Sequence, residues 1–154
     1  MHRGILSSLI VASCALAACA HAPVSAARND MSWSLQQKQG EEAQLRFGTP
    51  RGDVTLLALS CEPHSGDIDI TVTAPSDRMT LVALASDVQR RRYIMEPARS
   101  PTDDPWLLGA TKTSDPVMTR FAETGDLMLF NAGRGQLLPT DRDKAAKFLA
   151  ACQR

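Results

Sequence analysis

His64 is the only histidine after residue 21, and it stands beside a serine and two aspartates that could do chemistry. Ser65 follows it directly, and Asp67 and Asp69 come next. A nucleophilic triad needs a hydroxyl, an imidazole and a carboxylate in line, which adjacent residues of one tight turn cannot provide. The nucleophile motif Gly-x-Ser-x-Gly is absent from the sequence. We therefore expect His64 to be an exposed turn residue and expect no catalytic residue here.

The same three polar residues have a second interpretation as metal ligands. Asp67 and Asp69 share one face of an alternating strand, and His64 could reach over them to complete a divalent-ion site. Alternatively, they form the solvated polar face opposite Ile68 and Ile70. The alternation requires that polar face in any case, so we expect no metal and no cofactor.

Acidic pairs and a glycine turn are the other candidates for chemistry. Glycoside cleavage needs two carboxyl groups about 5–10 Å apart in a cleft. Glu41-Glu42 and Asp103-Asp104 are chain neighbours, which point to opposite faces of a strand. Gly133-x-Gly135 is too short for a phosphate loop and lacks a suitably placed lysine. The sequence therefore indicates neither a carboxylate enzyme site nor a nucleotide site.

Arg90, Arg91 and Arg92 form the densest charge on the chain, between Val88 and Tyr93. Basic residues on an exposed or edge strand discourage pairing with other sheets. The alternative is that they contact an anionic surface, either lipid phosphates or an acidic protein partner. Both interpretations place the three arginines on an exposed strand.

The N-terminus has the pattern of an export signal. Arg3 is followed by an apolar run from Ile5 to Ala18 and then by small residues. The run is shorter than the roughly 20 residues that span a bilayer. Removal of the signal would place the folded part outside the cytoplasm.

Leu16-Ala17-Ala18-Cys19 resembles the lipobox of bacterial lipoproteins. This resemblance implies cleavage before Cys19, a diacylated cysteine, and, with Ala20 next, sorting to the outer membrane facing the periplasm. Val11-Ala12-Ser13-Cys14 fits the same loose pattern but leaves a short apolar run. Val24-Ser25-Ala26 instead suits ordinary signal peptidase, which would release a soluble periplasmic protein. The signal is thus residues 1–18, or alternatively 1–26.

Cys61 and Cys152 are the only cysteines beyond the signal and lipobox. Two cysteines in an oxidising compartment are expected to pair. They form no Cys-x-x-Cys motif, and two cysteines without histidines cannot hold a structural zinc. We expect a disulfide that closes most of the domain into one loop.

Composition excludes some partners. Seventeen Lys and Arg balance seventeen Asp and Glu, and aromatic residues make up 5% of the chain. Nucleic-acid binding calls for a basic surface, so no nucleic acid is expected. Residues 19–30 are small and polar and read as a tether, and residues 31–154 have the size of one domain.

The domain begins with strand patterns and ends with helical ones. Val54 to Cys61 is apolar almost throughout, as for a strand covered on both faces, and residues 67–73 alternate and complete a hairpin. Alternating or apolar runs predict further strands near 33–35, 43–47, 79–85, 88–95, 106–111, 127–130 and 136–138. Residues 127–130 are apolar at every position, which predicts a short buried strand. We expect six to eight of these runs to form one antiparallel sheet.

Two helices follow from their caps and apolar stripes. Asp115-Pro116 begins one helix and Gly125 ends it. Thr140, with Asp143 three residues on, begins the other, whose apolar stripe includes Cys152. The predicted fold class is α+β: an antiparallel sheet or sandwich-like domain with two short C-terminal helices and one disulfide.

These expectations favour a non-enzymatic lipoprotein of the cell envelope that binds a protein partner or serves as an accessory module. Its partners would be the membrane, through the lipid anchor, and an envelope protein. Two alternatives stay open: a periplasmic enzyme inhibitor, and a hydrolase whose carboxylates are brought together by folding.

Overall fold

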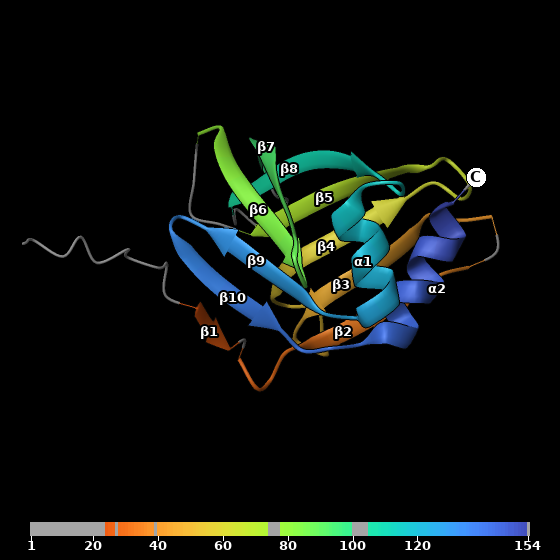
Figure 1. Ribbon diagram of the computed structural model, residues 1–154, viewed down its shortest axis with the longest axis horizontal. Coiled ribbons are helices and arrows are strands. Elements are labelled where there is room, and N and C mark those ends of the chain that lie inside the picture. Colours follow the sequence, from red (N-terminus) through yellow and green to blue (C-terminus); the bar gives the residue numbers. More distant parts are fainter. Residues whose placement is uncertain (1–23, 27, 39, 74–77, 100–104, 154) are drawn as a thin grey trace, which may run out of the picture.

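The computed structural model describes residues 24–26, 28–38, 40–73, 78–99 and 105–153, which form a curved sheet with helices at one end (Figure 1). Ten strands lie in the order β1-β10-β9-β6-β7-β8-β5-β4-β3-β2. They are β1 (Val24–Ala26), β2 (Ser32–Gln36), β3 (Ala43–Gly48), β4 (Thr55–Cys61), β5 (Asp67–Thr73), β6 (Thr80–Ser86), β7 (Gln89–Arg99), β8 (Pro105–Lys112), β9 (Leu127–Asn131) and β10 (Arg134–Leu138). The helices are α1 (Pro116–Thr124) and α2 (Arg142–Cys152).

The sheet is antiparallel except at one edge, where β1 pairs with β10 in parallel. The predicted mainly antiparallel sheet with two helices is confirmed, with more strands than expected. One added strand is β1, which lies inside the segment 19–30 that the sequence predicts as a tether. Val24 pairs with Gly135 and Ala26 with Leu137, so the sheet begins before residue 31.

The long strand β7 divides the sheet into two layers. Its residues Gln89–Met95 pair with β6, and its residues Glu96–Arg99 pair with β8. β1, β10, β9 and β6 therefore form one layer, and β8, β5, β4, β3 and β2 form the other (Figure 1). The core between the layers is built from the inward positions of the strands, among them Leu45, Phe47, Leu57, Leu59, Ile68, Ile70, Val82, Leu84, Met95 and Leu107, all fully buried.

Helix α1 covers one side of the opening between the layers, against β6 and β7. Asp115 caps its start, with Oδ1 accepting from Val117 N at 2.8 Å, and Gly125 ends it at φ 77°. A Cβ on Gly125 would come within 2.3 Å of Arg142 N, where the end of α1 meets the start of α2. Both predicted caps are confirmed, and glycine is required at 125 for its φ and for space.

Helix α2 packs on β3 and β2, but its N-cap is Asp141 rather than the predicted Thr140. Asp141 Oδ1 accepts from Lys144 N at 3.1 Å, whereas the Thr140 hydroxyl donates to Asp126. Partial burial acts to raise the pKa of Asp141, but hydrogen bonds from Lys144 and its charge outweigh this and lower the pKa. The Thr140 hydroxyl bonds to a residue from another part of the chain, and local sequence spacing does not reveal such a contact.

The predicted disulfide between Cys61 and Cys152 is present. It joins the last residue of β4 to the last residue of α2, with the two Cα atoms 5.7 Å apart and both residues buried. Backbone hydrogen bonds continue the connection, from His64 N to Ala151 O at 3.0 Å and from Gly66 N to Cys152 O at 2.9 Å. The turn after β4 therefore caps the end of α2.

Trp33 connects the far ends of the strand order. It lies on the edge strand β2, and its Nε1 donates to Pro139 O, just after β10, at 2.7 Å. Its ring lies 5.2 Å from that of Phe47 and 5.4 Å from that of Phe121. This buried side chain thus holds β2, β3, α1 and the end of β10 together.

We predict that Cys152→Ser alone lowers the free energy of unfolding as much as Cys61→Ser combined with Cys152→Ser. Losing either sulfur breaks the same cross-link, worth about 4–5 kcal/mol by the chain-entropy model for a loop this long. Urea unfolding of the three proteins measures this. Equal melting of the wild type with and without reductant would contradict it.

Tyr93 generates a second stability prediction. Its hydroxyl is buried and has no hydrogen-bond partner in the described residues, and burial, followed by the nearby Asp115 carboxylate, raises the pKa of the phenol. An unsatisfied buried hydroxyl costs about 1–3 kcal/mol. We therefore expect Tyr93→Phe to leave the free energy of unfolding unchanged or raise it by up to about 1 kcal/mol, measured in urea. A clear loss of stability would show that the hydroxyl has a favourable partner.

Candidate functional site

The structure places His64 at the end of α2. Its Nδ1–H donates to Gln153 O at 3.0 Å, and its backbone adopts the left-handed conformation at φ 60°. His64 is exposed, as predicted for a turn residue. Its ring and its backbone N–H both satisfy carbonyl groups at the helix end, so the histidine has a capping role that the sequence did not suggest.

The polar residues after His64 do not converge on its ring. The Ser65 hydroxyl exchanges hydrogen bonds with the backbone of Asp67, and the Asp67 carboxylate accepts from Lys112 Nζ at 2.6 Å. Asp69 is exposed. In the part of the chain that the structure covers, no three His, Cys, Asp or Glu side chains are grouped to hold a metal ion.

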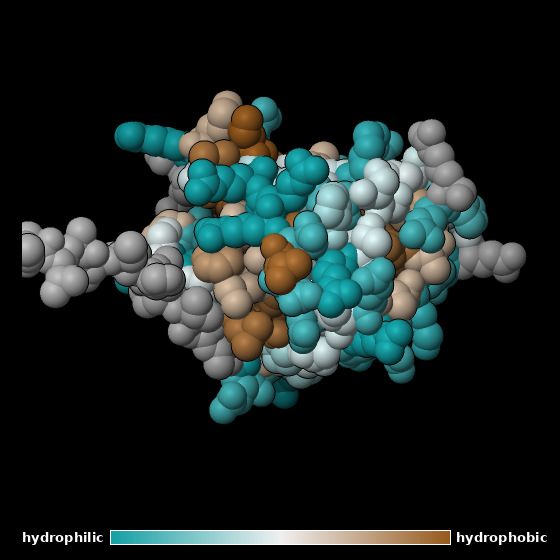
Figure 2. Space-filling model, in the orientation of Figure 1, coloured by the Kyte–Doolittle hydropathy of each residue, from teal (hydrophilic) through white to brown (hydrophobic). Residues whose placement is uncertain are grey.

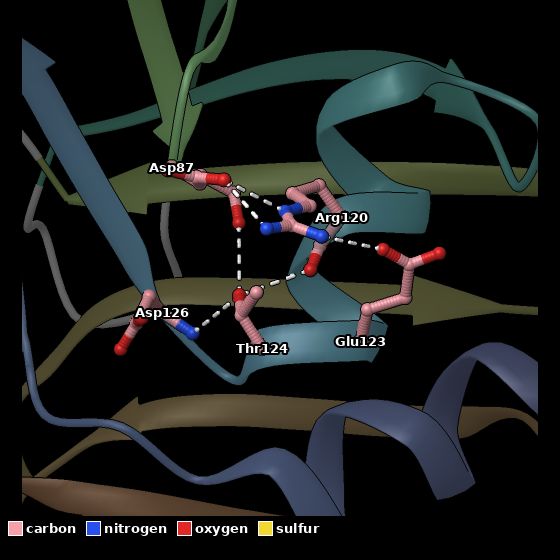
Figure 3. A network of polar contacts seen from close by, with 6 residues as sticks. Asp87, Arg120, Glu123, Thr124 and Asp126 are labelled. Carbon is pink, nitrogen blue, oxygen red and sulfur yellow. Dashed lines mark hydrogen bonds and ion pairs between the residues drawn. The ribbon is translucent and has the colours of Figure 1, made fainter.

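Folding does bring two carboxylates from distant segments to one hollow, Asp87 from the β6–β7 turn and Asp126 before β9. Arg120 of α1 engages Asp87, with Nε and Nη2 at 3.0 and 2.6 Å from Oδ2 (Figure 3). The carboxylates of Glu123 and Asp87 raise the pKa of Arg120.

Thr124 links this network to β9. Its hydroxyl donates to Arg120 O at 3.0 Å and accepts from Asp126 N at 3.1 Å (Figure 3). Each acid is thus held in contacts that join α1, the β6–β7 turn and the start of β9. The arrangement fixes one end of the β6–β9 layer.

The side of the β6–β7–β9–β10 layer that points away from the core carries several apolar side chains, and no described element covers it. Leu81 pairs with Ile94 across β6 and β7, and Met128 pairs with Leu137 across β9 and β10. We call this surface the outer face and define it by Met79, Leu81, Arg90, Arg92, Ile94, Met128, Phe130 and Leu137. Figure 2 looks onto this side of the molecule and shows hydrophobic residues gathered among hydrophilic ones.

The exposed fractions of the apolar residues on the outer face are large. Met79 is 63% exposed, Leu81 56%, Ile94 65% and Leu137 46%. The sequence suggested that residues 127–130 form a buried strand, which is wrong for two of them. Leu127 and Leu129 are buried in the core, while Met128 and Phe130 are only half-buried on the outer face. No described element covers that side.

The arginine run divides between the two sides of β7. Arg90 and Arg92 lie on the outer face, and the Arg90 guanidinium stands 4.2 Å from the centre of the Phe130 ring. Arg91 points to the other side, where its Nε lies 3.7 Å from Asp115 Oδ2. Neither Arg90 nor Arg92 forms an ion pair with a described residue. Gln89–Met95 is paired only with β6 in the described sheet, as expected for an exposed strand.

The other residues singled out in the sequence lie elsewhere. Glu41 and Glu42 are exposed just before β3, and Gly133 sits in the tight turn between β9 and β10 at φ 75°. Cys19 and the pair Asp103-Asp104 lie outside the described residues.

Comparison with family models, with curated proteins and with solved structures finds no match to this chain. None of the described helices is long and apolar enough to cross a membrane. We base the proposed function on the outer face. The sequence held one signal for it, since Leu127 to Phe130 is apolar at every position instead of alternating.

Proposed function

We propose that the protein is a non-enzymatic binding module of the bacterial cell envelope. Lipid on Cys19 anchors it to the outer membrane on the periplasmic side, and the outer face binds an acidic envelope protein. The observation that carries the proposal is the combination, on one sheet face, of exposed apolar side chains and two arginines without ion-pair partners in the described chain. Soluble proteins rarely leave a large contiguous apolar patch without a partner.

Charge explains why the proposed partner is an acidic protein. Arg90 and Arg92 border the apolar side chains, while Arg91 is already paired with Asp115 on the other side of β7. Carboxylates of a partner could form charge-assisted hydrogen bonds with these two guanidinium groups, which have no ion pair in the described chain. Arginine and aromatic side chains such as Phe130 are also typical of protein interfaces.

The pairing of β1 supports the lipoprotein cleavage. Val24–Ala26 is a strand of the sheet, so cleavage after Ala26 would remove β1 from the folded protein. Cleavage before Cys19 retains it. Cys19 precedes Val24 by five residues, which span at most about 18 Å when extended. A lipid on Cys19 would then hold the β1 edge of the sheet close to the membrane.

The alternatives differ in what the structure offers them. The hydrolase alternative would use Asp87 and Asp126, but Arg120 and the Thr140 hydroxyl already engage them. An enzyme inhibitor would be a special case of the proposed binding module, with an enzyme as the acidic partner.

We predict that Cys19→Ala moves the protein from the membrane fraction to the soluble periplasmic fraction and removes the mass of the attached lipid. Two or more acyl chains anchor a protein stably, whereas none remain in this variant. Cys14→Ala is the matched control and should stay in the membrane fraction. Membrane retention of Cys19→Ala with an unchanged mass would contradict the anchor.

We further predict that a photo-crosslinking residue at Leu81, on the outer face, captures a discrete protein in living cells. The same residue at Asp69, exposed on the other layer, is the control position. Arg92→Gln should reduce the captured product severalfold, because it removes one of the two unpaired charges.

Arg91→Gln makes the same charge change on the opposite side of β7 and should leave the captured product unchanged. Capture that is equal in both variants would contradict a charge-dependent partner. Crosslinking of position 81 to lipid alone would assign the outer face to the membrane surface instead.

A further inference from the structure

The two layers of the sheet separate at the end opposite the helices and leave a cavity of about 550 Å³ between them. This end lies where β9 turns into β10, away from α1 and α2 (Figure 1). Ligand pockets of proteins typically measure about 300–1,000 Å³. The helices fill the other end of the space between the layers with apolar side chains, among them Phe121 and Phe148.

Apolar residues from both layers line the inner part of the cavity. Val72 comes from β5 and Leu129 from β9, and Leu56 comes from β4. Phe47 pairs with Leu57 and Gly48 with Thr55, which leaves Leu56 as the extra residue of a bulge. A bulge redirects a side chain relative to the regular alternation. Leu56 accordingly packs against the core and lines the cavity.

Gly48 permits this bulge. A Cβ at that position would lie 2.2 Å from Val54 O, so a larger residue would push the strands apart. The position of Leu56 is thus built into the backbone of β3 and β4.

Polar side chains gather on the β9–β10 side of the cavity, and those of β9 and β10 have no partner among the described residues. Asn131 pairs with Arg134 in the strand register, and Leu129 pairs with Gln136. The side chains of Asn131, Arg134 and Gln136 line the cavity and have no hydrogen bond or ion pair with another described residue. Arg28, also at the cavity, is already paired with Asp30 at 2.7 Å. Arg134 therefore contributes a positive charge that no described residue pairs.

We propose that this cavity binds an anionic amphiphile, with an acyl chain against Leu56, Val72 and Leu129 and a carboxylate or phosphate head at Arg134. An apolar wall with a few convergent polar groups is the usual composition of a ligand pocket. Arg134 matches an anionic head, and Asn131 and Gln136 can donate further hydrogen bonds to it.

The position of β1 places the cavity near the source of such ligands. Val24 pairs with Gly135, which lines the cavity. If Cys19 carries the lipid of the proposed function, the cavity lies beside the anchored edge. The binding chemistry itself does not depend on that anchor.

The test is a titration of the full chain carrying Cys19→Ala with 11-(dansylamino)undecanoic acid, whose fluorescence rises in an apolar environment. We expect saturable binding that Arg134→Gln weakens about tenfold or more, as for loss of a charge-assisted hydrogen bond. Leu56→Trp should also weaken binding by filling the cavity. Arg142→Gln, an exposed arginine at the other end of the molecule, is the matched control and should bind like the parent.

Competition identifies the source of the head group. Displacement of the probe by hexadecanoate assigns the cavity to free fatty acids, and displacement by phosphatidylglycerol vesicles assigns it to phospholipid. Absence of saturable binding, or equal affinity in the parent, Arg134→Gln and Leu56→Trp, would overturn the proposal. Urea unfolding of each variant verifies that it is folded, and none of these results depends on the outer face or its partner.

Discussion

The bond between Cys61 and Cys152, with the helix cap beside it, is the interaction on which the arrangement of this protein depends. It ties the last residue of the chain's final helix to the end of a central strand, 91 residues away. Backbone N–H groups of the turn that follows this strand donate hydrogen bonds to the carbonyls of Ala151 and Cys152. Helix α2 is thus fixed at its C-terminus by a covalent bond and by hydrogen bonds. Its N-terminus is fixed by Asp141 and by the contact of Gly125 with Arg142.

Placing the helices at one end decides which surfaces remain free. α1 and α2 fill the space between the layers on the side where β4 ends and β5 begins. Among the surfaces that no described helix covers are the outer face of β6, β7, β9 and β10 and the cavity at the opposite end. The first combines exposed apolar side chains with Arg90 and Arg92, and the second combines an apolar wall with Arg134. Both combine apolar side chains with arginine, a composition that is common at binding surfaces.

Local rules in the sequence predicted the elements whose determinants are local. The hairpin of β4 and β5 followed from two strand patterns around a turn, and α1 followed from Asp115, Pro116 and Gly125. The disulfide followed from a count of cysteines and from the predicted export signal. The candidate surface was only partly predictable. The arginine run was identified, but alternation along β7 sends Arg91 toward α1 and its neighbours to the outer face.

What the sequence did not predict depends on contacts between distant segments. The local spacing predicts Thr140 as the helix cap, but its hydroxyl donates to Asp126 instead. The apolar run 127–130 predicted that Met128 and Phe130 are buried, yet no described element covers their side of the sheet. β1 has only three residues and lies in a segment of small and polar residues, so its strand conformation is recognised only from its pairing with β10. The cavity requires the bulge at Leu56 and the register of β9 on β10, and neither leaves a local signature.

The most direct measurement of the central bond is a thiol count on the mature protein purified from cells. The protein is denatured in the presence of an alkylating reagent without reductant, digested, and analysed by mass spectrometry. The structure predicts a single cross-linked pair of peptides containing Cys61 and Cys152, with neither residue alkylated. Recovery of both cysteines as separate alkylated peptides would contradict the disulfide and, with it, the placement of helix α2 at this end of the sheet.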